Sequence, residues 1–85
     1  MNTMTPILID VRNEREYMTQ RLRDAINIPL SRIHEVEKIE GAWDGREMQL
    51  YCATGARSER AKNILKAMGF NAKNIGGIVN NMSLL

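Results

Sequence analysis

Short aliphatic runs recur along the chain, and each one has the length of a strand. Pro6 to Val11 is a β-branched and aliphatic run that ends at a charged cluster, as in a parallel strand buried on both faces. Ala25 to Pro29 predicts a second short strand, which the proline stops. Met48 to Tyr51 predicts a third strand that runs directly into Cys52. Asn74 to Gly77 predicts a last strand and a tight turn.

Helical patterns lie between these strands. Asn13 and Glu16 have the spacing of a capping box, which predicts a helix from Glu14 to Thr19. Ser31 is expected to cap a second helix that ends at Gly41. Its apolar stripe consists of Ile33, Val36 and Ile39.

The strongest helical pattern begins at Ser58. Its apolar residues follow the i, i+3, i+4, i+7 rule and are Ala61, Ile64, Leu65 and Met68. Gly69 stands where a left-handed residue would end the helix. Asp44 and Gly45 predict a turn before the third strand, and the tail from Ile78 to Leu85 predicts one more helical turn.

This alternation predicts an α/β fold with three layers, in which helices flank a mostly parallel central sheet. The chain has 85 residues, which is enough for one compact core and too short for a second of ordinary size. We therefore expect a single domain over residues 1–85, with a shallow site built from few loops. We also expect a monomer.

Charge and composition exclude several function classes. Twelve Lys and Arg residues stand against ten Asp and Glu residues, a formal net charge of +2 without any basic run. Nucleic acid is therefore not an expected partner, whereas small anions suit this balance. The single cysteine, Cys52, and the single histidine, His34, cannot form a disulfide or a Cys/His zinc set. We expect no metal and no cofactor.

The N-terminus predicts neither a signal peptide nor a membrane span. Met1 to Asp10 carries no basic residue, and Ile7 to Ile9 is too short to span a bilayer. The chain as written is expected to be cytoplasmic, with no membrane contact. A mature secreted form that had lost its signal peptide would look the same, so a periplasmic location stays open.

The segment from Leu50 to Ser58 carries the chemistry. A buried strand ends at a thiol, a short loop containing Gly55 follows, and a helix begins. Loop N–H groups, the positive end of the helix dipole and the charge of Arg57 all favour a thiolate at Cys52. Such surroundings bring a cysteine pKa from about 8.5 to roughly 3.5 to 7.5. Ligands of open α/β sheets also bind at this carboxyl end of the strands.

A lone cysteine in a small chain is often only a small buried hydrophobe. The residues that follow Cys52 favour a reactive thiol instead. Thr54, Gly55, Arg57 and Ser58 pack a core poorly and suit an anion site.

The ordered set of motifs resembles the single-domain rhodaneses, or thiosulfate sulfurtransferases, of the phage-shock-protein-E type. The matching segments, in order, are Leu8 to Arg12, Glu16-Tyr17, Ala25 to Leu30, Cys52 to Ser58, Ala67 to Phe70 and Gly76-Gly77. The resemblance covers nearly the whole chain. Two departures are Asp24 and Ala53, at positions where relatives often have glycine and arginine respectively.

The resemblance implies that Cys52 is the nucleophile that carries sulfur as a persulfide. It implies that the donor is held by the loop residues, which are Ala53, Thr54, Gly55, Ala56 and Arg57, together with Ser58 at the start of the helix. It makes Asp10 and Arg12 supporting residues behind the loop. The implied donor is thiosulfate or a persulfide, and the implied acceptor is cyanide, a thiol or a protein.

Two alternatives remain open at this stage. One is a non-catalytic or protein-docking sulfur carrier, which the missing arginine at Ala53 favours. The other is a cysteine phosphatase or an arsenate reductase, because these enzymes also hold oxyanions between a strand end and a helix start. The count disfavours a phosphatase: only Ala53, Thr54, Gly55 and Ala56 separate Cys52 from Arg57, one residue fewer than in the cell-cycle phosphatases that resemble this fold.

Overall fold

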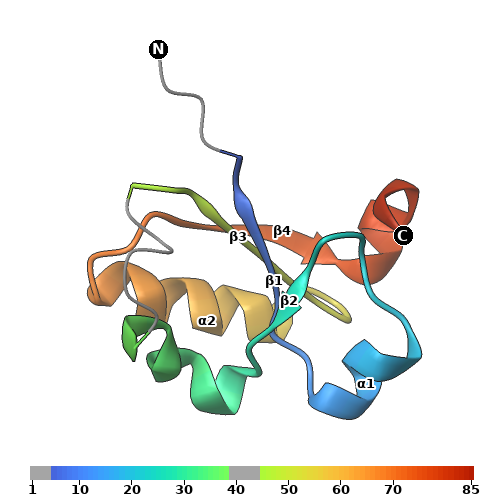
Figure 1. Cartoon of the computed structure of the whole chain (residues 1–85), viewed down its shortest axis with the longest axis horizontal. Coiled ribbons are helices and arrows are strands. Elements are labelled where there is room, and N and C mark those ends of the chain that lie inside the picture. Colours follow the sequence, from blue (N-terminus) through green and yellow to red (C-terminus); the bar gives the residue numbers. More distant parts are fainter. Residues whose placement is uncertain (1–4, 39–44) are drawn as a thin grey trace.

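The computed structural model describes residues 5–38 and 45–85 and shows a four-stranded, fully parallel sheet. Its strands are β1 (Ile7–Asp10), β2 (Ile26–Asn27), β3 (Met48–Cys52) and β4 (Ala72–Gly77). They lie in the order β2-β1-β3-β4, so the two central strands are β1 and β3 (Figure 1). The predicted α/β fold with a parallel sheet is confirmed.

Two helical segments cover one face of the sheet. They are α2 (Ala56–Ala67) and the 3₁₀ segment η1 (Leu30–Lys38), which lie side by side below the strands in Figure 1. The core on this face is formed by alternate strand residues with residues of η1 and α2. Its fully buried members include Ile9, Leu50, Ile33, Val36, Ala61 and Leu65.

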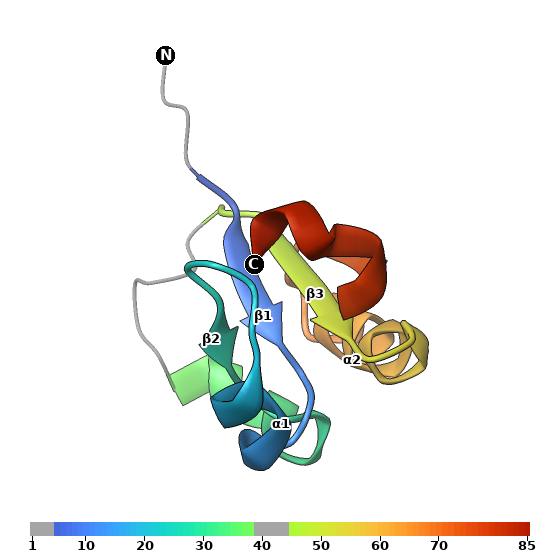
Figure 2. The same cartoon turned by 90° about the vertical axis from the view of Figure 1, so that its right-hand side faces the viewer.

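The opposite face carries a smaller apolar cluster. Leu22 and Ala25, between α1 (Glu14–Thr19) and β2, pack with Tyr51 of β3 and with Ile78. Ile78 begins the C-terminal 3₁₀ segment η2 (Ile78–Leu84), which curls past the end of β3 in Figure 2. The sheet is thus covered on both faces, as parallel sheets require.

The capping box predicted for α1 is present. The N–H of Glu16 donates to Asn13 Oδ1 at 2.8 Å, and the N–H of Asn13 donates to Glu16 Oε1 at 3.0 Å. The helix has the predicted bounds, Glu14–Thr19.

Several predicted boundaries differ from the structure. The first strand is one residue shorter at each end than predicted, and the last begins at Ala72, two residues early. The helix predicted from Ser58 begins at Ala56, because Gly55 already turns the chain in the left-handed conformation at φ 99°. The second strand is only Ile26–Asn27, between a turn and Pro29. The segment expected to be capped by Ser31 begins at Leu30 and is a 3₁₀ helix with a break at Arg32. Its predicted stripe residue Ile39 and its predicted end at Gly41 lie outside the described residues, as does Asp44.

The predicted end of α2 is confirmed. Gly69 has φ 94° and follows the C-cap Met68. The tail also forms the predicted helical turn, as η2. No helix within residues 5–38 and 45–85 combines the length and apolarity needed to cross a membrane.

Candidate active site

Cys52 is the last residue of β3 and is fully buried in the core on the α2 side. Its neighbour across the sheet is Gly77, the last residue of β4. The chain then passes through Ala53, Thr54 and Gly55 into α2. The sulfur therefore lies at the carboxyl edge of the sheet, directly below the start of a helix, as the sequence predicts.

Three donors approach the Cys52 sulfur. The N–H of Gly55 lies 3.0 Å from Sγ, and the N–H and hydroxyl of Ser58 lie 3.4 and 3.5 Å from it. Gly55 fits this position because its φ is 99° and a Cβ there would meet the Gly76 Cα at 3.4 Å. The predicted cradle therefore acts on Sγ through Gly55 and Ser58.

These donors change the acidity of the thiol. Burial raises the pKa of Cys52, but the hydroxyl and N–H of Ser58 and the N–H groups of Gly55 and Thr54 lower it more strongly, to about 7. Hydrogen bonds to the charged form favour that form. A large fraction of Cys52 is therefore thiolate at neutral pH. Thiolate is the nucleophilic form of cysteine.

The side chains of the other loop residues do not face inward. Thr54 and Ala56 are exposed, and Ala53 is half-buried. Thr54 lowers the pKa of Cys52 through its backbone, and the Ala53 carbonyl lies against Gly77. Thr54 thus acts on Sγ through its main chain, and the predicted roles of Ala53 and Ala56 in holding a donor stay predictions.

Arg57 sits at the rim of the loop and binds a carboxylate of α1. Its Nη1 and Nη2 donate to Glu16 Oε1 and Oε2 at 2.8 and 3.0 Å. This pair holds the pKa of Glu16 well below its usual range, at about 2, and raises that of Arg57. The sequence assigned Arg57 to a bound anion, whereas here its guanidinium is engaged by Glu16.

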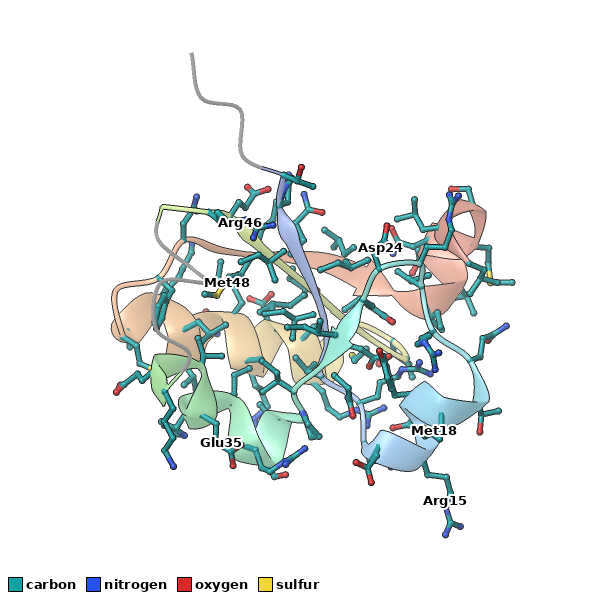
Figure 3. All side chains as sticks on the ribbon, viewed as in Figure 1. Arg15, Met18, Asp24, Glu35, Arg46 and Met48 are labelled. Carbon is teal, nitrogen blue, oxygen red and sulfur yellow. The ribbon has the colours of Figure 1, made fainter. Side chains whose placement is uncertain are left out.

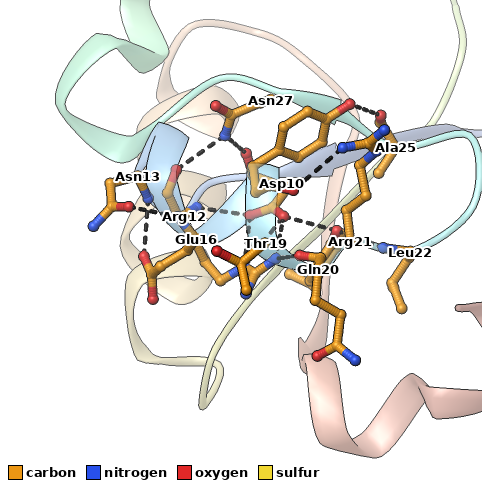
Figure 4. A network of polar contacts seen from close by, with 12 residues as sticks. Asp10, Arg12, Asn13, Glu16, Thr19, Gln20, Arg21, Leu22, Ala25 and Asn27 are labelled. Carbon is orange, nitrogen blue, oxygen red and sulfur yellow. Dashed lines mark hydrogen bonds and ion pairs between the residues drawn. The ribbon is translucent and has the colours of Figure 1, made fainter.

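Asp10 and Arg12, the predicted supporting residues, form a buried ion pair at the end of β1 (Figure 4), and Tyr51 is hydrogen-bonded to it. Arg12 Nη2 lies 2.7 Å from Asp10 Oδ2, and Arg12 also donates to the Gln20 carbonyl. The Tyr51 hydroxyl donates to Asp10 Oδ2 at 2.8 Å and accepts the N–H of Leu22 at 3.0 Å. This network joins the ends of β1 and β3 to the segment after α1.

Asn74 is a residue that sequence reasoning missed. It lies on β4 opposite Leu50, and its side-chain oxygen is 2.7 Å from the Ser58 hydroxyl. Its amide nitrogen donates to the Gly55 carbonyl at 3.1 Å. The signal available in the sequence is a polar residue inside a short strand, two positions before a glycine pair.

A surface hollow of about 250 Å³ opens beside Arg57. It is lined by Val11, Asn13, Pro29, Leu30, Ser31 and Arg57.

Within residues 5–38 and 45–85, no three His, Cys, Asp or Glu side chains gather closely enough to hold a metal ion.

A parallel α/β sheet with a thiol of lowered pKa between a strand end and a helix start defines a small domain with a cysteine loop. Comparison with protein families identifies which one: the Rhodanese-like domain family matches residues 1–81. The chain belongs to the rhodanese family.

Individual relatives agree with this assignment. The chain is 35% identical over 71 residues to the thiosulfate sulfurtransferase PspE of Escherichia coli K12, an alignment covering 82% of this chain and 68% of the relative. It is 32% identical to the tRNA uridine(34) hydroxylase of Buchnera aphidicola, covering 86% of this chain and only 25% of that longer protein.

A solved structure of a rhodanese with anions from E. coli superposes with a TM-score of 0.78 and 34% identity, covering 86% of this chain and 87% of that one. The predicted resemblance to single-domain rhodaneses is confirmed. Membership of this family supports sulfurtransferase activity in general terms.

Proposed function

We propose that the protein transfers sulfane sulfur through a persulfide on Cys52, from thiosulfate or a persulfide donor to cyanide or a thiol. One observation carries the proposal: the buried Cys52 sulfur faces the N–H groups of Gly55 and Ser58 and has a pKa of about 7. The E. coli relatives, a thiosulfate sulfurtransferase and a rhodanese solved with anions, support the same reading.

In the first half-reaction the Cys52 thiolate attacks the outer sulfur of thiosulfate. A bond forms between Sγ and that sulfur, the bond between the two thiosulfate sulfurs breaks, and sulfite leaves with the electron pair. The outer sulfur then carries the negative charge of the persulfide. Loop N–H groups that face this charge stabilise it without reorganising.

In the second half-reaction an acceptor attacks the outer sulfur of the persulfide. With cyanide a carbon–sulfur bond forms, the disulfur bond breaks, and Sγ takes the electron pair and becomes a thiolate again. The donors from Gly55 and Ser58 stabilise this leaving group. Donor and acceptor use the same sulfur in turn, so ping-pong kinetics are expected.

A second candidate is a sulfur carrier that receives persulfide sulfur from another protein and turns over free thiosulfate poorly. The Arg57–Glu16 ion pair favours it, because the positive charge of Arg57 is already balanced by Glu16. Ala53 adds no charge of its own.

Mass spectrometry after incubation with thiosulfate tests the mechanism. The protein should gain the mass of one sulfur atom, lose it on treatment with cyanide, and release sulfite. Cys52→Ser should abolish all three, and the chain holds no other cysteine that could replace it. His34→Ala, at an exposed position, is the control and should keep them.

A serine variant that still turns over thiosulfate would rule out the persulfide mechanism. A gain of sulfur from a protein persulfide, without steady turnover of thiosulfate, would favour the carrier.

A further inference from the structure

The Ser58 hydroxyl has one proton and three acceptors within reach. Its Oγ lies 2.7 Å from Asn74 Oδ1, 3.1 Å from the Gly55 carbonyl oxygen and 3.5 Å from Cys52 Sγ. Ser58 is fully buried, so the competition takes place inside the protein. By distance, the hydroxyl donates its stronger hydrogen bond to Asn74 and only a weaker one to the sulfur.

The Asn74 carboxamide is held in one orientation by groups from three elements. Its Oδ1 also accepts the N–H of Gly76 at 2.9 Å. Its Nδ2 donates to the Gly55 carbonyl at 3.1 Å and to Glu59 Oε1 at 3.0 Å. Turning the carboxamide over would place its nitrogen against the Gly76 N–H and its oxygen against two other oxygens. The acceptor atom therefore always faces Ser58.

We propose that Asn74 is a positioning residue for the reaction. The Ser58 hydroxyl donates its hydrogen bond to Asn74 Oδ1 while Sγ is uncharged, and turns to donate to Sγ when negative charge forms there. The charge moves during the cycle proposed above. It lies on Sγ in the free thiolate and on the outer sulfur in the persulfide. A hydroxyl that turns between Asn74 Oδ1 and Sγ follows this movement. The strength of its hydrogen bond to Asn74 sets the free energy needed to turn it toward Sγ.

Other charges around the sulfur are already paired. Arg57 binds Glu16 at the rim, Arg12 binds Asp10 behind the loop, and Glu59 binds Lys62. The variants below leave these charged side chains in place, so the change at Cys52 reports on the hydrogen bonds.

The first test measures the Cys52 pKa from the rate of alkylation by iodoacetamide against pH, which needs no sulfur donor. Asn74→Ala frees the Ser58 proton for the sulfur and should lower the pKa by about 0.5 to 1 unit, because a hydrogen bond to the thiolate favours it. Ser58→Ala should raise it. In the Ser58→Ala background, Asn74→Ala should change nothing further. Asn71→Ala is the matched control, an exposed asparagine one position before the same strand.

The second test rests on the proposed function and separates the two half-reactions by single turnover at pH 9, where the thiol is fully ionised. A less basic sulfur is a weaker nucleophile and a better leaving group. With a Brønsted coefficient of about 0.4 to 0.5, Asn74→Ala should slow sulfite release from thiosulfate about 2- to 3-fold and speed sulfur loss to cyanide by a similar factor. A loss of structure would slow both.

Asn74→Leu is the second variant, should Asn74→Ala fail to fold. Leucine fills a similar volume, removes the acceptor and adds no charge, so it should also lower the Cys52 pKa, and should change nothing further in the Ser58→Ala background.

A Cys52 pKa that rises in Asn74→Ala, or a shift of equal size with and without the Ser58 hydroxyl, would overturn the proposal, because Asn74 would then only hold the loop. The alkylation results stand even if thiosulfate is not a donor. A failure of the proposed function is therefore distinguishable from a failure of this role for Asn74.

Discussion

Arg57 and Glu16 face each other in a two-bond ion pair, with Nη1 2.8 Å from Oε1 and Nη2 3.0 Å from Oε2. The pair joins the first turn of α2 to the first turn of α1, where the capping box with Asn13 also holds Glu16. Arg15, one position earlier, points outward from α1 and away from the sheet (Figure 3). The positive charge that Arg57 would offer to the proposed donor is therefore largely balanced by Glu16.

Replacing Glu16 with Gln should release this charge. Glutamine keeps the capping box but removes the negative partner of Arg57. We expect kcat/KM for thiosulfate, a dianion, to rise about 3- to 10-fold, and that for methanethiosulfonate, a monoanion with the same outer sulfur, to rise less. Steady-state assays at low ionic strength measure both.

Glu14→Gln is the control, since it removes the same charge from the same helical turn. Equal gains for the two donors in Glu16→Gln, or a gain as large in Glu14→Gln, would contradict an electrostatic role of the pair.

The ion pair also predicts loss of stability in acid. The pKa of Glu16 is about 2 in the folded protein and about 4.5 ordinarily, so the stabilisation is complete above pH 4.5 and is lost as pH falls toward 2. The side chains are 31% and 37% exposed, so solvent screening reduces the effect to about 0.5 to 1 kcal/mol. Urea unfolding of the native protein and of Glu16→Gln at pH 6 and pH 3 measures it. The stability difference between them should shrink at pH 3; a constant difference would refute the assignment.

Tyr51→Phe should destabilise the protein by about 1.5 to 3 kcal/mol. The substitution removes the donor to Asp10 and leaves the buried N–H of Leu22 without an acceptor. Tyr17→Phe removes one half-buried bond, to the Ala25 carbonyl, and should cost about 0.5 to 1.5 kcal/mol. Denaturant unfolding compares the two. If Tyr51→Phe is no more costly than Tyr17→Phe, the hydroxyl of Tyr51 does not stabilise the network.

Local signals in the sequence predicted the local features of the fold. Asn13 and Glu16 are three residues apart, so the capping box and the helix they begin were readable directly. Cys52 was placed correctly at the end of a strand, because the apolar run before it and the Gly55 loop after it are contiguous.

Features that depend on long-range contacts were not predicted. Glu16 and Arg57 are 41 residues apart, and only the folded arrangement of α1 and the loop brings them together. Asn74 reaches Ser58 through the pairing of β4 with β3, in which the register shifts so that Leu50 faces Asn74 while Tyr51 faces Gly76. No periodicity in the sequence marks that irregularity.

Asp24→Gly should stabilise the fold. Asp24 is exposed and has φ 63°, the left-handed conformation that favours glycine. We expect an increase of up to about 1 kcal/mol in the free energy of unfolding. Asp24→Ala should instead lower it, because alanine lacks the short polar side chain that tolerates this conformation. Thermal and denaturant unfolding of the two variants provide the measurement, and stabilisation by both would show that the backbone is not strained here.

Gly77→Ala should distort the loop that follows Cys52. A Cβ at this position would lie 2.5 Å from the Ala53 carbonyl oxygen and 3.1 Å from the Thr54 Cα, both backbone atoms that cannot turn aside. A displacement of about 1 Å at a reacting centre can cost around a hundredfold in rate, and we expect a loss of that order. Val79→Ala, at an exposed position two residues further on, is the control. Sulfite-release assays compare the rates of the two variants. Full activity in Gly77→Ala would show that the loop tolerates the added carbon.

The pairing of Cys52 with Gly77, and of Ser58 with Asn74, has a consequence for synthesis on the ribosome. The nucleophile is made well before the strand that completes its surroundings. A nascent chain that ends before β4 already carries Cys52 and the donors from Gly55 and Ser58, but it lacks Gly77, whose backbone packs against the Ala53 carbonyl. One side of the loop that aims these donors at Sγ is then without its support. The surroundings of the sulfur are thus completed only when the last strand joins the sheet.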